Sequence, residues 1–131
     1  SQMKKVDKFI KKRRKSALRY DKLISQIDSI NSIKKDSRNI SANHLFPISI
    51  DFTSISRGKN DVMLELRKNG IMTQVHYVPI PLHPFYQKLG YNMERLPNAL
   101  NFYFQTLSIP IYPRLSFRKQ KKIIKEFKNL F

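Results

Sequence analysis

The chain has 131 residues, and its 26 Lys and Arg against nine Asp and Glu give a formal net charge of +17. This length predicts one domain. No apolar run approaches the roughly 20 residues that cross a bilayer, and the charged N-terminus differs from a secretory signal. The absence of Cys excludes disulfides, thiolate catalysis and Cys-based zinc sites, so we expect a cytoplasmic protein with no membrane partner.

The positive charge has two interpretations. It favours nucleic acid or an anionic surface as a partner, and the best local candidate for such a patch is Lys11-Lys12-Arg13-Arg14-Lys15. The other interpretation is a composition bias, in which Lys fills solvated helix faces. No fingerprint of RNA or DNA binding accompanies the charge, so we favour the bias and do not expect nucleic acid as a partner. A small basic module that binds nucleic acid or an anionic surface remains the alternative function.

A long amphipathic helix is predicted at the N-terminus, over residues 4–30. Its apolar residues recur at spacings of three, four or seven, which places them on one packing face: Val6, Ile10, Ala17, Tyr20, Ile24 and Ile27. Residues 31–43 are polar without periodicity and predict a loop. Alternating apolar side chains in residues 45–52 predict a half-buried strand, and Pro47 then has to lie at its start or on a sheet edge.

A second helix and a second strand are predicted in the middle of the chain. The helix covers residues 59–69, and Gly70 provides the left-handed residue that ends it. Alternation over residues 71–77 predicts a strand with two different faces. One face carries Ile71, Thr73, Val75 and Tyr77, and the other carries Met72, Gln74 and His76.

The last part of the chain predicts a Pro-rich loop over residues 78–94, a helix over 97–106 and a third strand over 107–111. Ser116 is the expected cap of a final helix. The order α-β-α-β-α-β-α predicts an α+β fold with a short three-stranded sheet and packed helices. We expect a single domain over residues 1–131, with the long helix at about 4–30 and an α+β core at about 44–131.

The sequence lacks the motifs of a self-sufficient enzyme. With three Gly in the whole chain, neither a phosphate-binding loop nor a dinucleotide fingerprint is present. The three His have neither the spacing nor the accompanying carboxylates of a metal site. No Gly-x-Ser-x-Gly turn occurs, and no close pair of acids lies in an apolar setting. We therefore expect no catalytic residue and no metal.

The densest run of chemically capable residues spans the second predicted strand and the loop after it. It reads Gly70-Ile-Met-Thr-Gln-Val-His-Tyr-Val-Pro-Ile-Pro-Leu-His-Pro-Phe-Tyr-Gln-Lys-Leu-Gly-Tyr91. Loops on a rigid scaffold often carry function, although a hydrogen-bonded structural His is the alternative for His76. The segment resembles the C-terminal domain of the DegT/DnrJ/StrS family of pyridoxal-phosphate-dependent nucleotide-sugar aminotransferases. Its members have a similar Gly-Ile-x-Thr-Gln-Val-His-Tyr strand, a Pro-rich loop and a Tyr-x-x-Leu-Gly segment.

Three further segments are similar to landmarks of that family, in the same order and at similar spacing. They are Arg19-Tyr20-Asp21, Ser41-Ala42-Asn43-His44-Leu45-Phe46 and Leu107-Ser108-Ile109-Pro110-Ile111-Tyr112-Pro113. Together the four segments cover nearly the whole chain. The resemblance is closest to members that aminate a UDP-linked 4-keto-6-deoxy sugar for surface polysaccharides, of the spore-coat polysaccharide or pseudaminic-acid type.

The resemblance implies the small C-terminal domain of a fold type I aminotransferase. In such enzymes a large N-terminal domain holds pyridoxal phosphate (PLP) on a Schiff-base Lys, and the small domain closes over the sugar. None of the 17 Lys here has a matching context. We therefore expect a truncated, split or remnant form that binds no PLP and is inactive alone. The implied partners are a separate large PLP-binding domain and, because family enzymes are generally homodimers, a second copy.

The resemblance also implies which residues face the substrate. The His-Tyr pair at the strand end carries over to His76 and Tyr77, and the loop over residues 79–86 becomes a sugar-facing wall. Several relatives have a second His four residues beyond that Tyr, where this chain has Pro81. His83, two positions later, is the candidate replacement. The predicted substrate-binding residues are thus His76, Tyr77 and His83.

Overall fold

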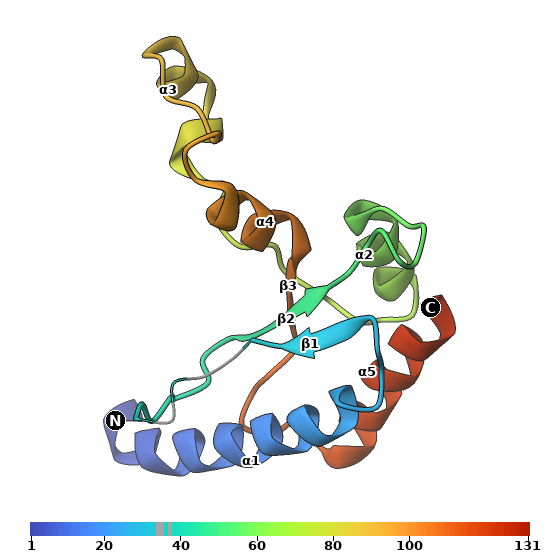
Figure 1. Cartoon of the computed structure of the whole chain (residues 1–131). Helices are drawn as coiled ribbons and strands as arrows, with labels where there is room; N and C mark the ends of the chain where they lie inside the picture. The colour runs from blue at the N-terminus through green and yellow to red at the C-terminus, as the bar shows by residue number, and fades with distance from the viewer. Residues whose placement is uncertain (34–35, 37) are drawn as a thin grey trace.

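A three-stranded antiparallel sheet forms the centre of the protein (Figure 1). The computed structural model describes residues 1–33, 36 and 38–131. The strands lie in the order β1 (Ile30–Ser32), β2 (Phe46–Ile50) and β3 (Thr106–Ile109). The helices that pack around the sheet are α1 (Val6–Ile24), α2 (Lys59–Lys68), α4 (Pro97–Gln105) and α5 (Phe117–Leu130). Short helical turns are η1 (Gln2–Lys5), η2 (Ile80–Leu82) and α3 (Pro84–Lys88).

The α+β class and the three-stranded sheet are confirmed, but the predicted order of elements is wrong at two places. One error is at the end of the first helix. The Ile24, Ile27 and Ile30 spacing continues the helical period, yet α1 ends at Ile24 and Ile30 pairs with Ile50 as the first residue of β1. Ile30 is buried in either case, so its apolar character did not distinguish a helix from a strand. The predicted loop over 31–43 includes residues 34, 35 and 37, which lie outside the described residues.

The other error is the strand predicted over residues 71–77, which forms a single bridge. Gln74 and Ser108 exchange both backbone hydrogen bonds, at 3.0 and 2.8 Å. The next hydrogen-bonded pairs in an antiparallel ladder would lie two residues away on each side. On one side is Pro110, which has no N–H to donate. On the other side the Thr106 N–H already donates to the Phe102 carbonyl at the end of α4, so the ladder cannot extend.

Several local predictions are confirmed. Phe46, Ile48 and Ile50 alternate inward along β2 as expected, and Pro47 is its second residue, just before the stretch that pairs with β1. Gly70 has φ +76°, and the Ile71 N–H bonds to the Leu66 carbonyl at 2.8 Å, which is the hydrogen bond of a Schellman C-cap. Ser116 caps α5 by accepting from the Lys119 N–H at 3.3 Å.

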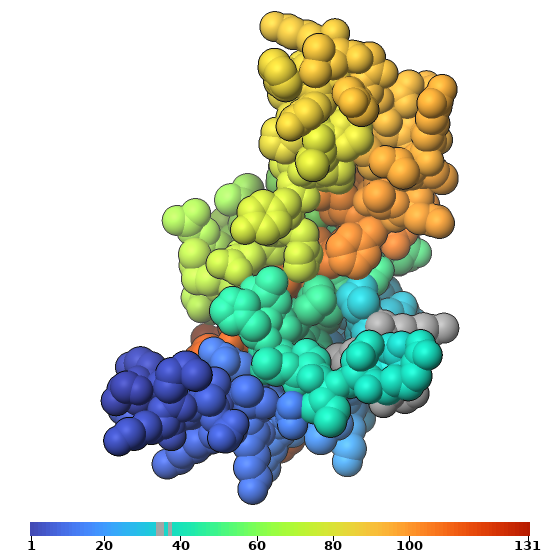
Figure 2. All heavy atoms as spheres, turned by 90° about the vertical axis from the view of Figure 1, so that its left-hand side faces the viewer, coloured from blue at the N-terminus to red at the C-terminus, as the bar shows by residue number. Residues whose placement is uncertain are grey.

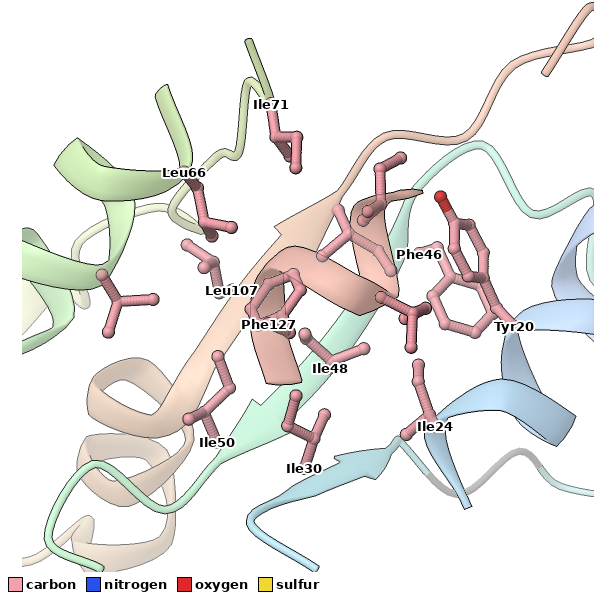
Figure 3. Packing of buried hydrophobic residues seen from close by; sticks show 14 of the residues in the cluster. Tyr20, Ile24, Ile30, Phe46, Ile48, Ile50, Leu66, Ile71, Leu107 and Phe127 are labelled. Carbon is pink, nitrogen blue, oxygen red and sulfur yellow. The ribbon is translucent and has the colours of Figure 1, made fainter. Parts of the chain in front are cut away.

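The core joins the family-like segments that are far apart in the sequence (Figure 3). The Tyr20 ring on α1 packs on Phe46 of β2, with centroids 5.1 Å apart. Its hydroxyl donates to the Pro110 carbonyl beyond β3 at 2.9 Å. Burial raises the Tyr20 pKa well above its usual value, so this hydroxyl remains a donor. One side chain therefore fixes α1 against both β2 and the end of β3.

An arm formed by residues 78–96 projects from the sheet at the end opposite α1 (Figure 2). It contains η2 and α3, which begin at or next to Pro residues. Its aromatic rings pack on one another, with Tyr86 at 5.3 Å from Phe85 and 6.0 Å from Tyr91. Among the described residues, no helix is long and apolar enough to cross a membrane.

Replacing Tyr20 by Phe is expected to lower the free energy of unfolding by about 1–2 kcal/mol, because the half-buried Pro110 carbonyl loses its donor. Urea denaturation measures the change. Tyr91→Phe is the matched control, since Tyr91 is exposed on the arm. Equal stability of the two variants would show that the Tyr20 hydroxyl does not stabilise the core.

Candidate functional site

His76 lies at the root of the arm, held by β3. Two residues after the Gln74 bridge, its Nε2 atom lies 3.1 Å from the Ser108 hydroxyl. Its ring also packs near Phe102 of α4, with centroids 5.8 Å apart. His76 is therefore a half-buried imidazole with Nε2 already bonded, as the structural alternative for this residue requires, and Nδ1 is left for a further hydrogen bond.

Lys59, the first residue of α2, sets the electrostatic environment of His76. Its Nζ atom donates to the Tyr103 carbonyl at 2.6 Å and lies 5.0 Å from the centre of the Tyr103 ring. Burial lowers the Lys59 pKa. Burial also lowers the pKa of His76, and the nearby Lys59 charge lowers it further. Both effects favour the neutral imidazole near pH 7.

Tyr77 points away from the protein beside this imidazole. Its side chain is 99% exposed, so the structure gives it no packing role within the described residues. It lines an open groove together with His76, and the other lining residues are His44, Leu45, Met63, Thr73, Gln74, Val75 and Val78. The groove encloses about 720 Å³, within the range of roughly 300–1,000 Å³ that is common for small-molecule sites.

His44 is a groove residue that the sequence analysis did not select. It lies just before β2 and lines both this groove and an adjoining hollow that reaches Ser108 and Tyr112. His44 and His76 are 32 positions apart in the sequence, so the sequence did not indicate that they line the same groove. The one available clue was the place of His44 in the Ser41–Phe46 landmark.

His83 lies on the arm and does not itself line the groove. Its Nε2 atom is 3.2 Å from the Val78 carbonyl, a contact that closes the turn at the base of the arm. The structure thus brings together His76 and Tyr77 of the three predicted residues. A substrate role for His83 stays a prediction.

The sequence profile described as the DegT/DnrJ/EryC1/StrS aminotransferase family matches residues 1–128. The chain therefore belongs to this family.

Two relatives with similar sequences act in sugar pathways, as far as their names describe them. The chain is 34% identical over 119 residues to the spore coat polysaccharide biosynthesis protein SpsC of Bacillus subtilis, covering 88% of this chain and 30% of SpsC. It is 32% identical over 126 residues to UDP-4-amino-4,6-dideoxy-N-acetyl-beta-L-altrosamine transaminase of Helicobacter pylori, covering 94% and 32%.

Two solved structures are similar over nearly the whole chain. PseC of Helicobacter pylori, an aminotransferase involved in pseudoaminic acid biosynthesis, has a TM-score of 0.87 at 30% identity, covering 100% of this chain and 35% of PseC. The PLP form of Spr1654, a proposed sugar aminotransferase of Streptococcus pneumoniae, has a TM-score of 0.85 at 26% identity, covering 98% and 33%. The family is PLP-dependent, and this chain spans about a third of the length of these relatives.

The groove can be compared with what PLP requires: a nucleophilic Lys, an acidic partner for the pyridinium and donors for the phosphate. Lys59 is the half-buried Lys nearest the groove, but its Nζ atom is bonded to Tyr103. No acidic residue that the structure describes is buried or lines the groove. The described residues therefore do not fit PLP.

We predict that the pKa of His76, followed by NMR of its ring, lies below 6.5 and rises in Lys59→Met. The His76 pKa should stay below 6.5 in that variant, because burial remains.

The lowered His76 pKa also makes stability depend on pH. As pH falls below 6.5, His76 of the unfolded chain takes up a proton before His76 of the folded chain does, so the free energy of unfolding decreases until the pH passes the folded-state pKa. Lys68→Met is the control, because Lys68 pairs with Glu65 at the far end of α2. A native His76 pKa at or above 6.5 would contradict this electrostatic account.

Proposed function

We propose that this chain forms the sugar-facing wall of a nucleotide-sugar aminotransferase whose PLP is held outside these 131 residues. The observation that carries the proposal is the pair at the base of the arm. A neutral His76 is fixed by Ser108, and next to it the fully exposed Tyr77 stands at the edge of the groove. The family match supplies the reaction class, which is amino transfer to a keto sugar.

The two side chains have different tasks in this proposal. His76 uses Nδ1 to hydrogen-bond a sugar hydroxyl while Nε2 is held by Ser108. Tyr77 offers a hydroxyl for a second polar contact and a ring face against the apolar side of the sugar. The arm, with His83, limits the groove on the side away from the sheet. The substrate class is a UDP-linked 4-keto-6-deoxy sugar destined for a surface polysaccharide, as the names of the relatives suggest.

The exposed apolar surface supports the involvement of a larger partner domain. Residues 72–104 contain twelve large hydrophobic residues that are exposed: Met72, Val75, Tyr77, Val78, Ile80, Phe85, Tyr86, Leu89, Tyr91, Leu96, Phe102 and Phe104. Contiguous exposed apolar patches on a protein mark interaction sites. We propose that a PLP-binding domain, or a second copy that brings one, covers this surface.

The chain alone is proposed to be inactive, in keeping with its poor fit to PLP. As the residues are arranged, a Schiff base would require Lys59 to give up its bond to Tyr103, and no acid lines the groove to partner the cofactor ring. Whether the form is truncated, split or a remnant, its own residues bind and orient the sugar, and they carry no step of the amino transfer.

A hybrid enzyme tests this proposal. If this chain replaces the corresponding third of the Helicobacter pylori transaminase, the hybrid should aminate the UDP-linked keto sugar. Tyr77→Ala should lower its kcat/KM about tenfold or more, because the sugar loses both a polar and an apolar contact. Phe117→Ala, which removes an exposed aromatic ring outside the groove and outside residues 72–104, should leave kcat/KM within about twofold.

The chain alone is the second arm of this experiment. Mixed with PLP, it should show neither a Schiff-base absorbance nor a product that borohydride makes permanent. A permanent adduct on Lys59 would overturn the claim of inactivity, and equal losses in Tyr77→Ala and Phe117→Ala would overturn the assignment of the wall.

A further inference from the structure

The positive charge of the protein is concentrated on two helices. The segments η1, α1 and α5 contain sixteen of the 26 basic residues and three of the nine acidic ones, and we call the outer side of these segments the cationic surface. The rest of the chain has ten basic and six acidic residues. Surface helix α2 is nearly balanced, with three basic and two acidic residues and a Lys68–Glu65 pair at 3.0 Å. A bias toward Lys in the whole composition does not explain this difference between surface helices.

The five Lys of α1 form a stripe along one face of the helix. Lys8, Lys11, Lys12 and Lys15 are all exposed and follow the i, i+3, i+4, i+7 spacing of one helix face. Lys22 continues the same face one heptad beyond Lys15. Like charges at these spacings destabilise a helix, so the stripe does not serve the stability of α1.

Helix α5 extends the stripe into a broad surface. The buried Gln120 side chain donates to the Ser16 carbonyl of α1 at 2.8 Å, which fixes the two helices side by side. All six basic residues of α5 are exposed: Arg118, Lys119, Lys121, Lys122, Lys125 and Lys128. Between the helices, Arg19 and Lys121 lie 5.1 and 4.9 Å from the centre of the Phe117 ring. One cation from each helix thus meets at this ring, so the charged sides of α1 and α5 adjoin there.

The composition of this face favours a lipid surface over a nucleic acid. The segments that form it contain twelve Lys and four Arg, and Lys is a point charge without the planar fork that reads phosphates and bases. Proteins that bind single strands place aromatic rings among their cations for base stacking. Here the exposed aromatic side chains lie mainly on residues 77–104, whereas Phe117 is already in contact with two cations. Exposed Met3 and Leu18, at 76% and 65%, instead add apolar contacts to the cationic surface.

We propose that the cationic surface docks the protein on anionic phospholipid headgroups. The attraction is electrostatic and peripheral, because the apolar side of α1 is buried against the sheet: Ala17, Tyr20 and Ile24. The arm projects from the opposite end of the protein (Figures 1 and 2). The groove and the apolar surface of residues 72–104 therefore remain accessible while the protein is docked. This inference does not depend on the proposed aminotransferase role.

Cosedimentation of the 131-residue chain with vesicles tests the proposal. With about 30% phosphatidylglycerol in phosphatidylcholine, the chain should bind at low salt, and binding should fall about tenfold or more in roughly 0.5 M NaCl. Pure phosphatidylcholine vesicles should bind little. The variant Lys8→Gln/Lys11→Gln/Lys12→Gln/Lys15→Gln should lose at least about tenfold in binding.

The matched control removes the same charge elsewhere. Arg57→Gln/Arg67→Gln/Lys88→Gln/Arg95→Gln changes four exposed basic residues outside the cationic surface and should bind nearly as the unchanged chain does. Circular dichroism of both variants verifies the fold. Equal losses in the two variants, or no binding to anionic vesicles at low salt, would overturn the proposal. Tighter binding to duplex or single-stranded nucleic acid than to vesicles, with the same dependence on the stripe, would overturn it in favour of a nucleic-acid surface.

Discussion

The candidate site depends on the contacts that Ser108 makes in the middle of β3. Its backbone exchanges two hydrogen bonds with Gln74, and its hydroxyl bonds to the His76 ring. On the other side, β3 pairs with β2, whose Phe46 packs on Tyr20 of α1. One short strand therefore connects the core to the groove. Because Pro110 and Thr106 prevent a longer ladder, the chain leaves the sheet soon after Gln74, which frees Tyr77 for the groove.

The local chemistry of the sequence predicted much of this fold. The alternation along β2, the glycine after α2 and the serine cap of α5 each express a preference of one residue or one short pattern. The errors are at Ile30 and at residues 71–77, where the outcome depended on a partner distant in the sequence. An apolar Ile is compatible with both a helix and a strand. Alternation at residues 71–77 carried no information about the missing N–H of Pro110 on the opposite strand.

The sequence predicted two residues of the candidate site but not the contacts that hold them in place. The resemblance selected His76 and Tyr77, and both line the groove. It gave no indication that His76 is bonded to Ser108 or near Lys59, because those contacts join residues 32 and 17 positions away. His44 enters the groove from the segment before β2 for the same reason. The resemblance also gave no indication that His83 contacts the Val78 carbonyl.

The central claim is that Ser108 acts through His76 to position the sugar. The most direct test is a double-mutant cycle on kcat/KM in the hybrid enzyme, with Ser108→Ala, His76→Ala and both together. The account predicts that each single change lowers kcat/KM by a similar factor, and that the double variant is no worse than His76→Ala alone. Losses that multiply in the double variant would contradict it, because they would show that Ser108 and His76 act independently.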